Sequence, residues 1–461
     1  MLRLAFVLLL SLFSIDPSLA QTTGEKTTSI LKAIIPVTTS SPLPYVSAYG
    51  ADLTGTSDSS AAVNSCLAAA GIGGVCYVDP GAKLLLAGNI PIPGHTTLDC
   101  LQNLPDSSDA PTSAYGTNPA LRLNSTYVIY ANGPSAAIRN CLIYKTGMTF
   151  PVTDSSAFSG MALWDNGNIN FNVTNSVIIG FDTAIWVQGA RPYIDKVYVD
   201  GTGVSKAAIE IDTGNTDSGY VREVKIQPLA QPPVRTCSGS TRPGTGLRMG
   251  GVGGPGAYLD DIVVQDFQTA QYDFEGGGTT LIGKIWADNI NGVISCPYRA
   301  YGVIVGPNTS ITANEVLIAQ QADGIMLLGN GALTSVASLQ ITNTYNGGAG
   351  IVLGDNSHSG NLSAGVVQIA NGGNEAVYWA HANSFFGVGT LVLANMPGRP
   401  YLLTSVATSI DAQGGGFNAQ TIIDDAGHSL FNPWNGTGGF FAGANPVSVW
   451  PTGGIAQLYS P

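Results

Sequence analysis

Short apolar runs recur along most of the chain and are separated by polar residues, Gly and Asn. One pattern reads apolar-x-x-apolar-x-apolar, and its clearest copies begin at Ile194, Val221, Leu259, Ile282, Ala313 and Val336. A second run with alternating apolar positions accompanies these copies. The second runs cover residues 184–187, 208–211, 246–249, 271–274, 302–305, 324–327, 350–353 and 376–379. Runs of this length and alternation predict short β-strands.

The repeat also predicts how these strands assemble. A unit of a few short strands cannot bury its apolar side alone, but stacked units pair in parallel and form continuous inward-facing rows. A unit length of about 22 to 28 residues fits a parallel β-helix. Leucine-rich repeats would need a fixed Leu and Asn spacing that is absent, and propeller blades need about 40 residues. We therefore predict an all-β protein, a parallel β-helix solenoid.

The pattern also suggests where the chain divides. Residues 1–20 have the features of a secretory signal peptide: Arg3, an apolar run over 4–13, and small residues at Ser18 and Ala20. A membrane anchor is the less favoured alternative, because that run is too short to span a bilayer. No later segment is long and apolar enough to span one, so we expect a secreted, periplasmic or cell-surface protein. The further expected segments are a flexible leader (21–44), an N-terminal cap module (45–97), the parallel β-helix (98–435) and a C-terminal tail (436–461).

Composition narrows the class of protein and of partner. Charged residues are 10% of the chain, hydrophobic residues are 44%, and there are 59 Gly, which favours a β-rich secreted protein over a membrane or disordered one. The formal net charge of −12 repels phosphate backbones, and no basic cluster offsets it, so we expect no nucleic-acid partner. The same charge disfavours a strongly anionic polymer as substrate. No C-x-x-C pair occurs and the four His are scattered, so no metal site is expected.

The residues after the leader form an ordered series. Residues 59–70 predict a helix that Asp58 caps and Gly71 ends. Around it lie the segments 46–52, 58–64, 73–78, 80–81, 90–92 and 97–98. The series resembles the opening module of the pectate-lyase-like superfamily, which is found in tailspike-type depolymerases and in relatives of polygalacturonases. The resemblance implies a right-handed parallel β-helix with a capping helix at its first coil, continuing to about residue 420, and polysaccharide as the partner.

The resemblance does not extend to one reaction. The family's acidic Gly-Asp-Gly turn is Thr54-Gly55-Thr56 here, and the polygalacturonase motifs have no ordered counterpart except Asp260 and Asp261, which resemble their paired aspartates. The superfamily therefore implies carbohydrate chemistry in general. A polysaccharide-degrading glycoside hydrolase without a cofactor is the first hypothesis.

Two alternatives stay open. One is a polysaccharide lyase with a Lys or Arg base, in which acidic residues such as Asp260 and Asp261 hold Ca²⁺ against a uronate. The other is a non-catalytic glycan-binding or envelope protein, whose apolar outward row from residue 304 to 352 would dock a partner or a second subunit. Trimers occur among tailspike relatives, so a homo-oligomer also stays open.

The six cysteines are expected to pair, because an even number follows a signal peptide. In the stacked arrangement Cys66 on the cap helix reaches Cys76 on the next strand. Cys100 and Cys141 sit on successive coils. The remaining pair, Cys237 and Cys296, lies in the two longest inserts, on either side of the coil that carries Asp273.

Candidate chemistry lies on the outward positions of the second strands. These positions are Trp186, Glu210, Arg248, Asp273, Ile304, Met326, Val352 and Tyr378. Asp212 and Glu275 lie just past two strand ends, and we predict that they bind the substrate. Glu210 and Asp273 would be two rungs apart, roughly 9 to 10 Å between backbones, whereas the carboxyl groups of inverting glycosidases stand about 6.5–9.5 Å apart. We predict Glu210, Arg248 and Asp273 as catalytic, with Trp186 stacking on a sugar ring and Arg248 binding sugar carboxylates or hydroxyls. The alternative is an ion-paired surface row without catalysis.

The first strands carry a second set of outward residues. One row holds charges of both signs, as expected of a solvated face or, alternatively, of a lyase site; it consists of Lys196, Glu223, Asp261, Lys284 and Glu315. The next outward position holds Tyr198, Lys225 and Trp286, and we predict that Tyr198 and Trp286 line a sugar groove.

Overall fold

The computed structural model describes residues 44–102, 119–150, 157–212, 219–227, 244–250, 255–267, 269–288, 301–321, 323–329, 334–342, 344, 348–355, 357–371, 375–379, 384–394, 402–403, 416–424, 429–431, 440–442 and 447–449. The expected signal peptide and nearly all of the leader lie outside these residues. No helix among them is long and apolar enough to cross a membrane.

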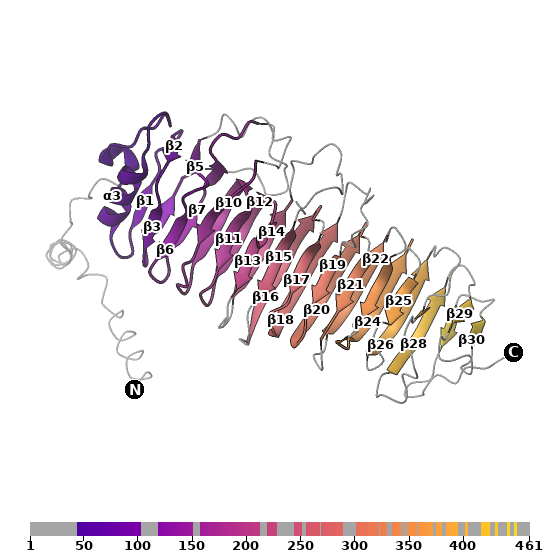
Figure 1. Cartoon of the computed structure of the whole chain (residues 1–461). Helices are drawn as coiled ribbons and strands as arrows, with labels where there is room; N and C mark the ends of the chain where they lie inside the picture. Colours follow the sequence, from indigo (N-terminus) through magenta and orange to yellow (C-terminus); the bar gives the residue numbers. More distant parts are fainter. Residues whose placement is uncertain are drawn as a thin grey trace, which may run out of the picture. The chain divides into compact units, whose positions relative to one another are not determined.

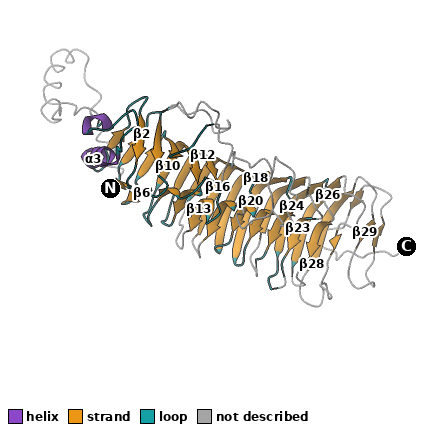
Figure 2. Cartoon of the chain, turned by 45° about the horizontal axis from the view of Figure 1, so that its top comes forward, coloured by secondary structure: helices purple, strands orange, loops and turns teal. Residues whose placement is uncertain are grey.

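Two parallel sheets run through these residues and wind together, coil upon coil, into a right-handed parallel β-helix (Figures 1 and 2). The first sheet contains β1 (Val75–Tyr77), β2 (Lys83–Leu86), β4 (Thr97–Asp99), β5 (Ala120–Leu123), β7 (Ala137–Arg139), β8 (Leu142–Lys145), β10 (Asn172–Phe181), β12 (Tyr193–Gly201), β14 (Tyr220–Ile226), β16 (Pro255–Gln265), β18 (Gly278–Asp288), β20 (Thr309–Ala319), β22 (Thr334–Thr342), β24 (Asn361–Ala370), β26 (Phe385–Ala394), β28 (Gly416–Asp424) and β31 (Val447–Val449).

The second sheet holds the shorter strands that follow in each coil. It contains β3 (Ile90–Pro93), β6 (Ile129–Asn132), β9 (Met161–Trp164), β11 (Thr183–Val187), β13 (Ala207–Asp212), β15 (Thr245–Gly250), β17 (Ala270–Phe274), β19 (Tyr301–Val305), β21 (Asp323–Leu327), β23 (Ala349–Leu353), β25 (Glu375–Trp379) and β27 (Leu402–Leu403). Pairing between coils is parallel up to β28, whereas β31 pairs antiparallel with β28, and β29 (Ser429–Phe431) antiparallel with β30 (Phe440–Ala442). The predicted fold class is therefore confirmed.

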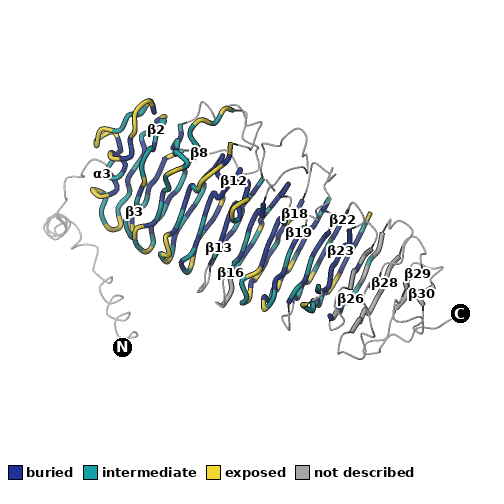
Figure 3. Tube along the Cα trace, viewed as in Figure 1, coloured by how far each residue is buried: buried dark blue, intermediate teal, exposed yellow. Residues whose placement is uncertain are grey.

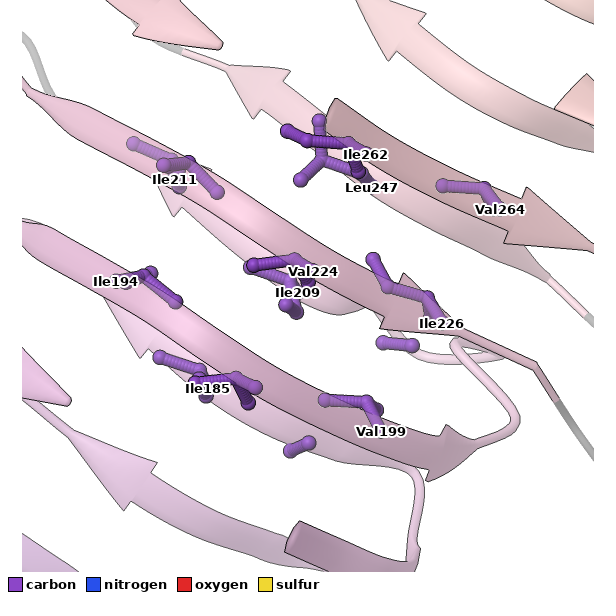
Figure 4. Close-up of a cluster of buried hydrophobic side chains, with 14 of the residues drawn as sticks. Ile185, Ile194, Val199, Ile209, Ile211, Val224, Ile226, Leu247, Ile262 and Val264 are labelled. Atoms are coloured by element: carbon purple, nitrogen blue, oxygen red, sulfur yellow. The ribbon is translucent and has the colours of Figure 1, made fainter. Parts of the chain in front are cut away.

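Apolar side chains hold the two sheets together. Each copy of the repeated pattern pairs in register with the next, so that Ile194 aligns with Val221 and Val221 with Leu259. On the second sheet Ile209 lies between Ile185 and Leu247 in the same way. Figure 4 shows the side chains of Ile185, Ile194, Ile209 and Leu247 pointing into the space between the sheets, and Figure 3 shows that buried positions continue from coil to coil. Because side chains alternate across a strand, burying one set fixes the neighbouring set as outward.

The first coil begins under a short cap. A 3-10 helix, η2 (Val46–Tyr49), precedes α3 (Ser60–Ala70), whose expected end at Gly71 is observed. The N-cap position is Ser59, one residue after the expected Asp58. Asp58 accepts hydrogen bonds from the backbone N–H and hydroxyl of Ser60 and from the N–H of Ala87. Its carboxylate thus ties the helix to the end of β2 as well as satisfying the first turn.

Disulfides fasten the first coils. Cys66 of α3 is bonded to Cys76 of β1, and Cys100 is bonded to Cys141 of a later coil, as predicted. A cross-link of this kind stabilises a fold mainly by restricting the unfolded chain. Cys237 and Cys296 lie outside the described residues, so their pairing stays a prediction.

One buried tyrosine joins the two sheets across the core. Tyr272 of β17 is fully buried, and the single proton of its hydroxyl is shared between the carbonyl oxygens of Ile262 in β16 (2.7 Å) and Trp286 in β18 (3.0 Å). We expect Tyr272→Phe to lower the free energy of unfolding by about 1 kcal/mol, because a buried carbonyl group loses its donor. Chemical denaturation measures this, with Tyr49→Phe at an exposed position as the control. An equal loss in both variants, or none in Tyr272→Phe, would contradict this role for the hydroxyl.

Candidate functional site

The outward positions of the second sheet form one continuous row. Backbone register aligns Glu210 with Arg248 and Arg248 with Asp273, as the sequence predicts. Trp186 is the next rung on the side toward the N-terminus, and Ile304 is the next on the other side. We call this set the outward row; its members are Tyr130, Trp164, Trp186, Glu210, Arg248, Asp273, Ile304, Met326 and Val352.

The inward neighbours fix the orientation of the charged residues. Ile209 and Ile211 flank Glu210 in β13, and both are buried in the core. Tyr272 and Phe274 flank Asp273 in β17 in the same way. A shift of one residue in either strand would move a carboxyl group into the core, so the apolar alternation specifies this register strongly.

Arg248 lies between carboxyl groups and contacts three of them. Its Nη1 atom is 3.5 Å from Glu210 Oε1, its Nε atom is 3.7 Å from Asp273 Oδ2, and its Nη2 atom is 3.3 Å from Glu275 Oε2. Glu275 directly follows β17 and is exposed. The three predicted catalytic residues and the predicted binding residue Glu275 are therefore brought together.

The two carboxyl groups of the row are buried although they face outward. The side chains of Glu210 and Asp273 are 3% and 11% exposed, against 36% for Arg248. Within the described part of the chain, Glu210 Oε2 and Asp273 Oδ1 are buried and have no hydrogen-bond partner. Buried polar atoms are nearly always paired, because leaving one unpaired costs free energy. Exceptions of this kind are candidates for a functional site.

Burial and neighbouring charge shift the proton affinity of all three groups. Burial, with the charges of Glu275 and Glu210, raises the pKa of Asp273 to about 7, although Arg248 opposes the shift. Burial also raises the pKa of Glu210, against the opposing effect of Arg248 and Lys206. For Arg248, burial lowers the pKa, but the surrounding carboxylates outweigh it and the pKa is raised. Arg248 is thus a permanent cation between two carboxyl groups that hold protons unusually well.

Aromatic rings continue the outward row beyond Glu210. The rings of Trp164 and Trp186 stack with centroids 5.4 Å apart, and Tyr130 lies 6.4 Å from Trp164. Lys206 places its Nζ atom 4.0 Å from the centre of the Trp186 ring. Because β9 and β13 flank β11 on opposite sides, the Trp186 ring lies between Trp164 and Lys206. Its contact with a sugar ring, which the sequence predicts, remains a prediction.

Sequence reasoning missed Tyr130, Trp164 and Lys206. The first two could have been found by extending the row toward the N-terminus, since each follows an inward residue, Ile129 or Leu163, in a short apolar run. Lys206 lies just before its strand, at a position that no alternation marks.

A glycine separates Asp212 from the centre of the site. Gly250 aligns with Asp212 across the strands. A Cβ atom placed on Gly250 would lie 3.6 Å from Asp212 Oδ1, 3.6 Å from Glu210 Oε1 and 3.7 Å from Arg248 Nε. Asp212, a predicted binding residue, therefore borders the same space as Glu210 and Arg248, and Gly250 has no side chain to fill it.

The other predicted binding residues lie apart, on the first sheet. Tyr198 is 1% exposed and belongs to an outer apolar cluster with Leu142, Tyr144 and Val177. Its side chain is therefore buried and does not line a surface groove. Trp286 is 40% exposed. Neither residue is on the sheet that carries Glu210 and Asp273.

The mixed-charge row of the first sheet forms exposed ion pairs. Lys196 Nζ lies 3.7 Å from Glu223 Oε2, and Lys284 Nζ lies 3.7 Å from Glu315 Oε2, with every side chain more than a third exposed. Such pairs contribute little to stability and are usual on a solvated face. The described residues contain no group of three or more His, Cys, Asp or Glu side chains that could hold a metal ion, and Asp260 and Asp261 belong to none.

The similarities to known proteins that are found are to solved structures. No family model matches the chain, and no curated protein sequence matches it. Among solved structures the chain is similar to the Dettilon tailspike protein, with 13% identity, coverage of 82% of this chain and 68% of that one, and a TM-score of 0.44. It is also similar to PfbA, a surface adhesin of Streptococcus pneumoniae, with 12% identity, coverage of 83% of this chain and 92% of that one, and a TM-score of 0.42. A third similar structure is the catalytic unit of a GH87 alpha-1,3-glucanase from Streptomyces thermodiastaticus, with 15% identity, coverage of 86% of this chain and 69% of that one, and a TM-score of 0.42.

Proposed function

We propose that this protein hydrolyses a polysaccharide, with Asp273 as general acid and Glu210 as general base. The observation that carries the proposal is a pair of buried carboxyl groups two rungs apart, on either side of Arg248, each with an oxygen that has no hydrogen-bond partner among the described residues. Two rungs correspond to roughly 9 to 10 Å between backbones. Inverting glycosidases hold their carboxyl groups about 6.5–9.5 Å apart, and we propose that arrangement for two carboxyl groups that rise from backbones at this spacing.

Asp273 is suited to the acid role. With a pKa of about 7, its carboxyl group keeps a proton through the mildly acidic range, where an ordinary aspartate has lost it. It can therefore donate that proton to the glycosidic oxygen as the bond to the anomeric carbon breaks.

Glu210 is suited to the base role. Burial raises the pKa of Glu210, and the positive charges of Arg248 and Lys206 limit that rise by stabilising the carboxylate. As carboxylate it accepts a proton from a water molecule whose oxygen bonds to the anomeric carbon on the opposite face of the sugar. Each turnover thus gives one proton to the leaving oxygen and takes one from water, and the positions of both carboxyl groups are held by Arg248.

An assay of a polysaccharide panel tests the reaction class. A hydrolase releases new reducing ends without unsaturated products, and the anomer first released, observed by NMR, is inverted. A lyase would release unsaturated products that absorb in the ultraviolet, and a binding protein would release neither. Either of the last two outcomes would rule out the proposal. The binding protein stays the second candidate, because the contacts of Arg248 could also serve only to pair charges between coils.

We also propose that the protein works outside the cytoplasm. Both disulfides observed among the described residues join parts of the fold that are buried, and structural disulfides persist in oxidising compartments. Detecting the protein in the culture medium, periplasm or cell envelope of its source would test this. Recovery with the cytoplasmic fraction would contradict it.

A further inference from the structure

We infer that the sugar unit bound between Glu210 and Asp273 carries no acid group, so that the site selects neutral glycans and rejects uronates. The inference rests on the proposed function, since it concerns the glycan bound at that site. It replaces the expectation that Arg248 binds a carboxylate of the substrate.

The charges around Arg248 are the first observation. The guanidinium group already contacts Glu210, Asp273 and Glu275, at 3.5, 3.7 and 3.3 Å. Asp212 is a fourth acidic group at the same place, beside Gly250. A carboxylate of the substrate would therefore lie close to four acidic residues. The positive charge of Arg248, the cation they surround, is already offset by their carboxyl groups. At such short range, like charges on partly buried groups repel strongly.

The free acceptor atoms are the second observation. Glu210 Oε2 and Asp273 Oδ1 are buried without a hydrogen-bond partner among the described residues. As the ionised base, Glu210 only accepts hydrogen bonds, so a group that pairs with its Oε2 atom must donate. A hydroxyl group of a neutral sugar donates, whereas a uronate carboxylate cannot and would be repelled by Glu210. Asp273, protonated in the acid role, can pair with an oxygen atom of either kind of sugar.

Gly250 leaves one side of the polar groups uncovered. A Cβ atom there would lie 3.6 to 3.7 Å from Asp212, Glu210 and Arg248. These are ordinary contact distances, so an alanine would fit. The larger side chain of valine would cover the polar atoms that a sugar unit has to reach.

Matched polysaccharides test the charge preference. The probes are neutral glucans, mannans and xylans, the C6-carboxylated derivatives of the glucans and mannans, pectate and alginate, all at one ionic strength. Affinity electrophoresis measures binding and reducing-end release measures cleavage. We expect binding of at least one neutral glucan or mannan, with about tenfold weaker binding of its carboxylated derivative or more. Equal or tighter binding of the carboxylated form, or binding of none of the probes, would overturn the inference.

The two readouts separate this inference from the proposed function. A neutral glycan that binds selectively but is not cleaved supports the charge preference and contradicts the proposal that the protein is a hydrolase. Cleavage of pectate or alginate by hydrolysis supports the hydrolase and contradicts the charge preference.

Two variants sharpen the test. Glu275→Gln removes one of the four acidic groups. It should therefore reduce the ratio of binding affinities for the neutral and carboxylated polysaccharides, which we call the gap, about threefold to tenfold. The matched control is Glu315→Gln, a similarly exposed glutamate that pairs with Lys284 on the first sheet, and it should leave the gap unchanged.

Gly250→Val should weaken binding of the neutral glycan about tenfold or more, with an unchanged melting temperature. An unchanged gap in Glu275→Gln, or unchanged binding in Gly250→Val, would contradict the assignment.

Discussion

Replacing Asp273 by Asn or Glu210 by Gln should lower kcat on a cleavable polysaccharide by about 10²- to 10⁴-fold, the usual contribution of a positioned general acid or base. Both substitutions keep the size of the side chain and remove its ability to exchange a proton. The measurement is the initial rate of reducing-end release at saturating substrate. The matched controls, Asp261→Asn and Glu315→Gln, make the same changes on the exposed row of the first sheet and should keep the wild-type rate.

The two variants should fail for different reasons. A glycosyl fluoride has a leaving group that needs no proton, so Asp273→Asn should regain activity on the fluoride of the correct sugar. Glu210→Gln should stay slow, because water still needs a base. If the roles are reversed, the pattern will be reversed as well. If both variants keep the wild-type rate on the polysaccharide, the site is not catalytic.

The pH dependence of the wild-type enzyme follows from the same assignment. Since the pKa of Asp273 is about 7, the fraction of enzyme with a protonated acid falls as the pH rises through that value. We therefore expect kcat/KM of the wild-type enzyme to fall as the pH rises above about 7. The residual kcat/KM of Asp273→Asn should not show this alkaline decrease. An alkaline limb that persists in Asp273→Asn would belong to another group.

Much of the fold and the outline of the site followed from alternation alone. Ile209, Ile211, Tyr272 and Phe274 face the core, so the residues between them must face outward, and parallel stacking then puts Glu210, Arg248 and Asp273 side by side. Strand alternation has a period of two and admits no intermediate register, which is why these neighbours were predictable over gaps of 25 residues and more.

Burial of the outward groups was not predictable in this way. Glu210 is 2% exposed although it points away from the core. The exposure of an outward side chain depends on its neighbours on adjacent coils. It also depends on residues outside the strands, such as Lys206, which directly precedes β13. For the same reason Tyr198, predicted to line a groove, is packed in an outer apolar cluster. Alternation shows which way a residue points and gives no information on what covers it.

The left-handed backbone at one position of the first strands could not be predicted. Lys196, Glu223 and Asp261 occupy equivalent positions in β12, β14 and β16 and have φ values of 56°, 51° and 51°. Gly and Asn are the residues that tolerate this region most easily. A charged residue inside a strand therefore gives no sequence signal for it.

Asp273→Asn should also make the protein more stable at alkaline pH, relative to the wild type, by up to about 4 kcal/mol. The pKa of Asp273 rises from 3.8 to about 7 on folding, mainly because of burial. Well below pH 3.8 the carboxyl group is neutral in both states and has no ionisation cost. As the pH rises to 7, the unfolded chain releases the proton while the folded protein retains it, so wild-type stability falls. Above pH 7 both states are ionised and the loss is complete.

Asparagine cannot ionise, so the difference in unfolding free energy between variant and wild type should grow between pH 4.5 and pH 8. Denaturation with urea at the two pH values measures it, and Asp261→Asn is the matched control, for which the difference should hardly change. An outward row that served only to pair charges would behave in the opposite way: loss of the Asp273–Arg248 contact would destabilise the variant most where the aspartate is ionised. A more stable and inactive Asp273→Asn is therefore the result that separates a site under functional constraint from a structural ion pair.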